Sequence, residues 1–198
     1  MRKHNVPEWY IYSCKKIKYM FPKAHATAYV IMALRIGWFK VHRPIFYYAA
    51  YFSKRAKRLD AEIFALGKNA IRNKINEIET MIKNKSKDVT DKDKDLLTEL
   101  HLALEMVLRG YKFRQIDLDK SQAVDFTIGD DLKSLYLPFI AIDSLGETVA
   151  KSIEEARKQA PFTSKKDFES RTSVNKTQYA KMHTLGVFDN LPENDTLL

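Results

Sequence analysis

The chain has 198 residues and is 45% hydrophobic, enough apolar material for one packed domain or two small ones, which excludes a disordered chain. Its net charge of +9 is unevenly spread: residues 1–59 hold 13 basic residues and one acid, whereas the remainder holds 21 basic and 24 acidic residues. The same first segment carries 13 of the 23 aromatic residues. Basic residues interleaved with aromatics favour nucleic-acid binding, although a basic segment whose aromatics only pack together has the same composition.

Other classes of protein match the sequence less well. The apolar run between His25 and Arg35 is far shorter than the roughly 18 residues of a membrane-spanning helix. Arg2 and Lys3 are not followed by the apolar core of a signal peptide. A single cysteine, Cys14, excludes an internal disulfide and a cysteine-cluster zinc site. We therefore expect a cytoplasmic protein without a membrane partner; a basic protein that binds anionic vesicles is the weaker alternative.

Three helices are expected in the first 58 residues, which we predict to form one domain. The first, amphipathic, covers residues 6–20, the central one starts at Pro22 and stops before Pro44, and the third continues to about Ala56. Apolar residues cover nearly the whole circumference of the central helix. We therefore expect that helix to lie among other elements rather than on a surface.

The central helix also carries cations near both ends, namely Lys23, His25, Arg35 and Lys40. Lys23 lies at the helix start, where free N–H groups already favour anions. A buried rod with cations at both ends is suited to hold a negatively charged group. For His25 a satisfied core histidine is the alternative.

The character of the chain changes near Asp60, where we place a domain boundary. Apolar residues at helical spacing predict a long amphipathic helix over residues 63–82. After a charged loop, Thr90 is the expected N-cap of a second helix, which ends before Gly110. These two helices (60–110) are expected to pack as an antiparallel pair. Residues 113–138 predict a small β ribbon, with a strand from Ala123 to Ile128 and its return over 135–137.

Residues 139–190 contain the clearest short motif. The run Ile142-Asp143-Ser144-Leu145-Gly146 predicts a tight turn that feeds a helix starting near Glu147. It resembles a helix-hairpin-helix motif, whose usual turn is Gly, an apolar residue and Gly; Ser144 stands at the first glycine. Small residues let the backbone approach a phosphate, and the N–H groups and helix dipole favour that anion. The candidate phosphate-binding residues are Ser144, Leu145, Gly146 and Lys151.

Such a contact would bind double-stranded DNA through its backbone, without reading bases. Glu147 places a negative charge beside the expected phosphate, and a plain helical hairpin without DNA is the alternative reading of the motif. A second, degenerate unit follows, with Thr163 or Ser164 capping a short helix and Leu185-Gly186 closing the last one. The predicted fold class is therefore mainly α with a small β ribbon and tandem helix-hairpin-helix units.

Three longer runs of mixed residue types carry a wider resemblance. They are Val6-Pro7-Glu8-Trp9-Tyr10-Ile11, Tyr19-Met20-Phe21-Pro22-Lys23-Ala24-His25-Ala26 and Pro44-Ile45-Phe46-Tyr47-Tyr48-Ala49-Ala50-Tyr51-Phe52. They resemble the fingers region of the PolC-type DNA polymerase III alpha subunit, and the later segments follow in that family's order. The resemblance implies that residues 1–58 are the C-terminal part of the helical fingers and that 59–190 are a helical duplex-binding region.

The resemblance also implies roles for particular residues. Lys23, His25, Arg35 and Lys40 would face the incoming nucleotide or the template. Residues 191–198 would be a clamp-binding-like tail, in which Asn194, Thr196, Leu197 and Leu198 contact the sliding clamp. The family's clamp peptide commonly ends in an aromatic residue that this chain lacks.

The implied function is that of a DNA-binding segment of a DNA-directed DNA polymerase, a nucleotidyltransferase. In the family the Mg²⁺-binding carboxylates lie in a palm upstream of this region, so we expect no catalytic residue, metal or cofactor here, and no polymerase activity of this chain alone. Its implied partners are double-stranded DNA, primer-template, the sliding clamp and the remainder of the polymerase. A free-standing, sequence-independent DNA-binding or clamp adaptor without catalysis is the alternative.

Overall fold

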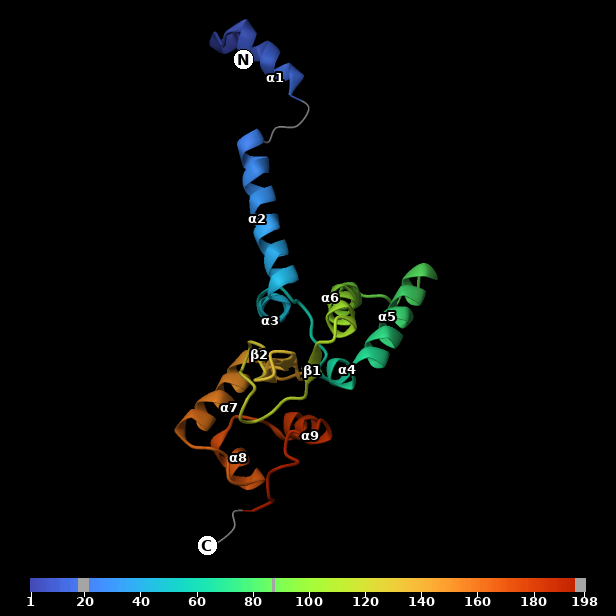
Figure 1. The fold of residues 1–198 in the computed structure, drawn as a ribbon, viewed down its shortest axis with the longest axis vertical. Coiled ribbons are helices and arrows are strands. Elements are labelled where there is room, and N and C mark those ends of the chain that lie inside the picture. Colours follow the sequence, from blue (N-terminus) through green and yellow to red (C-terminus); the bar gives the residue numbers. More distant parts are fainter. Residues whose placement is uncertain (18–21, 87, 195–198) are drawn as a thin grey trace. The chain divides into compact units, whose positions relative to one another are not determined.

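The computed structural model describes residues 1–17, 22–86 and 88–194, and these form two compact units, Met1–His42 and Arg43–Leu198 (Figure 1). The second unit begins before residue 59, where the change in charge placed the expected boundary. Helices predominate, and the strands are few and short, which confirms a mainly α fold with a small β ribbon.

The first unit consists of a 3₁₀ turn, η1 (Arg2–His4), followed by helices α1 (Glu8–Lys16) and α2 (Lys23–His42). Residues 18–20 of the expected first helix lie outside the described residues. No residue of α2 is buried, and Tyr29, Leu34 and Val41 are each about two-thirds exposed. The expectation that this helix lies among other elements is therefore wrong for the described chain. Its apolar residues surround the axis, so covering them would require neighbours on several faces.

The helical elements of the second unit are α3 (Pro44–Lys54), α4 (Ala61–Leu66), α5 (Lys68–Lys83), α6 (Asp91–Leu108), η2 (Phe139–Ala141), α7 (Glu147–Gln159), α8 (Lys165–Arg171) and α9 (Lys176–Thr184). Its core includes an aromatic cluster around Phe113, whose ring stacks on Phe64 at a centroid distance of 4.8 Å. Phe52 from α3 packs against the same ring at 5.3 Å. Helix α3 therefore shares the core of the later residues.

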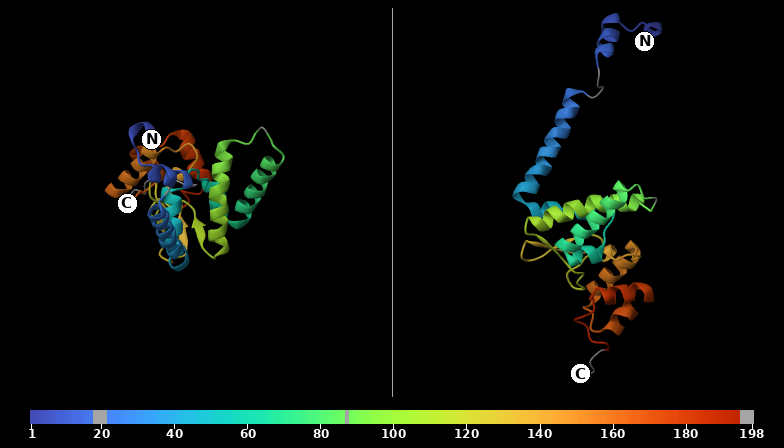
Figure 2. Two further views of the ribbon diagram at one scale, coloured as in Figure 1. Left: turned by 90° about the horizontal axis from the view of Figure 1, so that it is seen from above. Right: turned by 90° about the vertical axis from the view of Figure 1, so that its right-hand side faces the viewer.

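The long helix expected over residues 63–82 is divided in two. Gly67, at φ +80°, ends α4 and precedes α5, because a glycine adopts this left-handed conformation without steric cost. Helix α5 then lies beside α6, as both Figure 1 and Figure 2 show. Thr90 begins α6 with a capping box shared with Asp93, and Gly110 follows that helix at φ +87°, so both predicted helix ends are confirmed.

The sheet has three short strands in the order β1 (Lys112–Arg114), β3 (Ser134–Tyr136), β2 (Thr127–Ile128). β2 and β3 are antiparallel, as the ribbon prediction required, and β1 adds to β3 in parallel. The strand expected from Ala123 is shorter because its first amides bond elsewhere. Ala123 donates to Glu154 on α7 (2.9 Å), and Phe126 donates to the Ser53 hydroxyl on α3 (2.9 Å).

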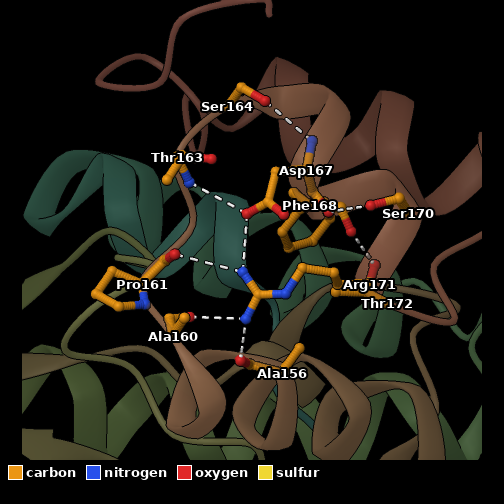
Figure 3. A network of polar contacts seen from close by, with 10 residues as sticks. All are labelled: Ala156, Ala160, Pro161, Thr163, Ser164, Asp167, Phe168, Ser170, Arg171 and Thr172. Carbon is orange, nitrogen blue, oxygen red and sulfur yellow. Dashed lines mark hydrogen bonds and ion pairs between the residues drawn. The ribbon is translucent and has the colours of Figure 1, made fainter. Parts of the chain in front are cut away.

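Arg171 joins α8 to the end of α7 (Figure 3). Its guanidinium donates to the carbonyl of Ala156 and to that of Ala160 at 2.8 Å, which are acceptors at the end of α7. It also pairs with Asp167 at 2.8 Å and lies over the ring of Phe162. One side chain from α8 therefore satisfies the Ala160 carbonyl and gives a second donor to the Ala156 carbonyl, which also accepts from Ala160 N–H.

Tyr48 links α3 to α6 inside the core. Its hydroxyl donates to Glu105 at 3.0 Å and accepts from Arg109 at 3.1 Å, and its side chain is fully buried. Burial raises the pKa of Tyr48 to about 12, because an ionised phenol is poorly solvated there.

We predict that Arg171→Met lowers the free energy of unfolding by about 2 kcal/mol, since it leaves several acceptors of one guanidinium without their donor. Arg171→Lys should recover only part of this loss, because an ammonium cannot reproduce the planar fork. Urea denaturation followed by circular dichroism measures both. The exposed Arg72→Met on α5 is the matched control and should change stability by less than about 0.5 kcal/mol. Equal losses for Arg72 and Arg171 would contradict the assigned role.

The raised pKa of Tyr48 predicts a loss of stability in alkali. A group whose folded pKa lies above its unfolded value contributes stability that is complete below pH 10 and disappears as the pH rises through 12. Thermal melting across this range should show a smaller alkaline loss for Tyr48→Phe than for the unmodified chain. Replacing the exposed Tyr10 by Phe should leave the alkaline loss unchanged. Superimposable profiles for Tyr48→Phe and the unmodified chain would refute the assignment.

Candidate nucleic-acid interface

The turn between η2 and α7 has the geometry expected of a phosphate-binding hairpin. Leu145 is buried, and its N–H donates to the carbonyl of Ile142 at 3.1 Å, which closes the turn. Ser144 adopts φ +67°, the left-handed conformation that the usual glycine takes at this position. Ser144, Leu145 and Gly146 are thus brought together as one backbone turn at the start of α7.

Gly146 leaves this turn open on its outer side. It is the N-cap residue of α7 in an extended conformation (φ −76°, ψ 162°), and no side chain caps the helix. A Cβ added at Gly146 would meet no atom within 4 Å. The first N–H groups of α7 therefore lack a side-chain acceptor, and the positive end of the helix dipole is accessible to an anion.

Helix α9 holds the turn in place from the other side. The Gln178 side-chain amide donates to the carbonyl of Ser144 at 2.9 Å, and Gln178 is only 6% exposed. Lys181 lies one turn further along α9, and its ammonium donates to the Asp143 carboxylate at 2.6 Å. The Lys181 hydrogen bond holds the pKa of Asp143 below its usual range. Two contacts therefore hold the hairpin turn to α9: a hydrogen bond from the buried, uncharged Gln178 amide, and the surface ion pair between Lys181 and Asp143.

Lys151 does not reach the turn in this structure. Its ammonium pairs with Glu147, one turn earlier on α7, at 2.6 Å, and this hydrogen bond raises the pKa of Lys151. The carboxylate that the sequence placed beside the expected phosphate is thus accompanied by a cation. Both side chains are more than half exposed, so the pair can rearrange at little cost.

The hairpin forms one wall of a groove of about 1380 Å³ within the second unit. Its other walls are the loop between α3 and α4, the start of α6, and α9. The basic side chains that line it are Lys57, Arg58, Lys74, Lys92 and Lys181, and the acidic ones are Asp60, Glu62, Asp93 and Asp143.

Two of these acids cap helices. Asp60 caps α4 by accepting from Ile63 N–H at 3.0 Å, and Asp93 completes the capping box of α6. The hydrogen bond from Thr90 holds the pKa of Asp93 low. Three of the groove cations are paired as well: Lys57 with Asp95 at 3.1 Å, Lys74 with Glu77 at 2.8 Å and Lys181 with Asp143 at 2.6 Å. The groove therefore has mixed charge with an excess of one basic group, and a phosphate backbone would meet these cations by exchanging with their exposed partners.

The four cations predicted to face nucleotide or template all lie on α2, in the other unit. A rise of 1.5 Å per residue separates Lys23 from Arg35 by about 18 Å along the axis. His25 makes an edge contact with the ring of Tyr29 at 4.5 Å, and Arg35 contacts the Met32 sulfur. The structure therefore does not gather Lys23, His25, Arg35 and Lys40 into one anion site.

The predicted clamp-binding residues are mostly outside the structure. Asn194 is exposed, whereas Thr196, Leu197 and Leu198 lie outside the described residues. The chain just before them is fixed, because Pro192 accepts from Lys165 N–H at 2.9 Å and Glu193 pairs with the Lys165 ammonium at 2.9 Å.

Within the described ranges, no cluster of three or more His, Cys, Asp or Glu side chains is arranged to hold a metal ion. Among the same residues, no helix combines the length and apolarity that crossing a membrane requires.

Sequence reasoning missed Gln178 and the groove cations as residues of this interface; the cations are Lys57, Arg58, Lys74, Lys92 and Lys181. A local signal existed for Gln178, because Asn175 and Gln178 have the spacing of a capping box, which the structure contains. The contact of its amide with Ser144, 34 residues away, had no local signal.

Comparison with known proteins agrees with this geometry. Residues 110–197 match the family model described as a helix-hairpin-helix motif. The chain is 48% identical over 197 residues to "DNA polymerase III PolC-type" of Streptococcus pyogenes serotype M5 (strain Manfredo) and of serotype M1, and 47% identical to that of serotype M2 (strain MGAS10270). Each alignment covers 100% of this chain and 13% of the relative. The chain is thus homologous over its full length to DNA polymerase III PolC-type and contains a helix-hairpin-helix region.

Proposed function

We propose that this chain is the duplex-binding, C-terminal segment of a replicative DNA-directed DNA polymerase of the PolC type. The observation that carries the proposal is the open hairpin turn at Ser144–Gly146, which lines a groove with five basic and four acidic side chains. The turn would hold one DNA phosphate through its N–H groups, and the groove cations would neutralise neighbouring phosphates. Such binding would be independent of base sequence, as a polymerase needs.

Homology over the full chain, including residues 1–42, supports the polymerase context over a free-standing adaptor. In this context the first unit belongs to the fingers, and Lys23, His25, Arg35 and Lys40 meet nucleotide or template at separate points along α2. The catalytic Mg²⁺ would be held elsewhere in the whole polymerase, which acts in the cytoplasm. The tail from Asn194 onward is a candidate contact for the sliding clamp.

The exposed apolar surface of α2 supports the remainder of the polymerase as a partner. Large apolar side chains such as Trp38 and Phe39, each 51% exposed, seldom remain uncovered on a free protein. The chain spans 13% of the length of the relatives it matches, so those relatives contain further protein of the size needed to cover this helix.

The DNA-binding proposal predicts that Gly146→Glu weakens binding of a short duplex roughly tenfold at moderate salt, because a carboxylate would occupy the place of the phosphate. The melting temperature should not change, since the site has room for a side chain. Fluorescence anisotropy across a salt series measures the affinity and its salt slope. Gln159→Glu is the matched control, because it adds the same charge at the exposed far end of α7. Identical curves for Gly146→Glu and the unmodified chain would overturn the proposed phosphate site.

The fingers assignment predicts that the isolated chain associates through α2. The double substitution Leu34→Glu and Val41→Glu should suppress self-association at high protein concentration, because it removes exposed apolar surface. Sedimentation velocity measures the change. Leu108→Glu, which replaces a similarly exposed leucine on α6, is the control and should leave association as it is. A chain that stays monomeric without any substitution would count against an uncovered partner surface on α2.

A further inference from the structure

The ion pair at the hairpin joins the turn to the groove. The Lys181 ammonium donates to the Asp143 carboxylate at 2.6 Å and lies 3.3 Å from the Asp143 carbonyl and 3.4 Å from the Ser144 hydroxyl. Both residues line the groove, and the Asp143 side chain is 77% exposed. The Asp143 carboxylate therefore lies at the turn and contacts Lys181, the same cation that a bound phosphate would contact.

The fold does not need this ion pair to hold the turn. Gln178 fixes the Ser144 carbonyl from a buried position, and the bond from Leu145 to Ile142 closes the turn. Exposed ion pairs contribute little to stability. This distinguishes Asp143 from Asp60 and Asp93, whose carboxylates cap helices.

A second cation also acts on the same carboxylate. Arg58, from the loop between α3 and α4, contributes to lowering the pKa of Asp143, although less than Lys181 does. Lys181 and Arg58, which are far apart in the sequence, thus both act electrostatically on one exposed carboxylate. This carboxylate offers them an anionic oxygen, as a DNA phosphate would.

We propose that Asp143 is a built-in competitor of the DNA phosphate, and that Lys181 exchanges the Asp143 carboxylate for a backbone phosphate when duplex binds. This inference rests on the proposed function and assigns two further residues to it. Lys181 becomes a phosphate-contacting residue. Asp143 weakens binding and thereby favours a duplex contact that forms and breaks readily, as sliding along DNA requires.

The test is duplex binding by the full 198-residue chain, measured by fluorescence anisotropy across a salt series. Asp143→Asn should bind a short duplex roughly threefold more tightly, because an ion pair of this kind no longer competes. The slope of log affinity against log salt should stay the same, because Lys181 neutralises the same phosphate in both proteins, whereas Lys181→Met should make it shallower by about 0.9. Asp143→Ser should show the same gain and serves as a second variant if the amide disturbs the turn.

Two further variants identify the cause of any gain in duplex affinity. Lys181→Met should weaken binding, and adding Asp143→Asn to it should give no further gain, because the freed cation is then missing. Glu169→Gln on α8 removes one exposed acidic charge outside the groove and should leave affinity unchanged. A gain that persists without Lys181, or that Glu169→Gln reproduces, would refute the proposed exchange.

The failures of the two proposals are distinguishable. If the folded, unmodified chain binds duplex and Gly146→Glu weakens it, but Asp143→Asn and Asp143→Ser bind equally or more weakly, the competition is wrong and the phosphate site stands. If the unmodified chain binds no duplex at low salt while its circular dichroism shows the native fold, both proposals are overturned.

Discussion

The position of the hairpin turn depends on one buried amide group, that of Gln178. Its oxygen accepts from Asn175 N–H at 3.0 Å, which caps α9, while its nitrogen donates to the Ser144 carbonyl at 2.9 Å. Because the amide is planar, these two bonds fix the start of α9 and the turn before α7 relative to each other. The left-handed conformation of Ser144 costs about 1–2 kcal/mol for a residue with a Cβ. The Gln178 bond and the burial of Leu145 help to offset that cost and keep the turn in a shape that glycine would adopt freely.

The basic excess of the groove comes from the first segment. The residues after position 59 carry more acidic than basic groups, and to the groove lining they contribute three lysines and four acids, so Lys57 and Arg58 make the lining basic on balance. Many acids also serve local structure. Asp167 holds Arg171, and Glu154 accepts from Ala123 N–H and pairs with Lys158. A carboxylate satisfied by a cap or a partner cation presents a weaker field to a distant ligand.

Local signals in the sequence predicted much of this fold. Thr90, Gly110 and Ser164 mark helix ends because their chemistry acts within one turn of the backbone. The break at Gly67 had no such signal, since the apolar spacing continues across it and an isolated glycine is tolerated in a helix. Strand β1 was missed because it pairs with β3, which follows about 20 residues later in the chain, and its pattern alone does not name that partner. The turn of the candidate site was predicted for the same local reasons, whereas its anchors on α9 depend on tertiary packing.

The structure shows how the basic residues of the first segment are distributed between α2 and the groove. Along α2 the cations are distributed over the helix, and residues two positions apart, such as Lys23 and His25, project about 200° apart around it. Such an arrangement does not form a single anion site. Lys57 and Arg58, at the end of the same basic segment, instead lie in the second unit and line the groove. Residues that sequence composition grouped together are thus divided by the fold, and the last two of the basic run complete the surface that the hairpin begins.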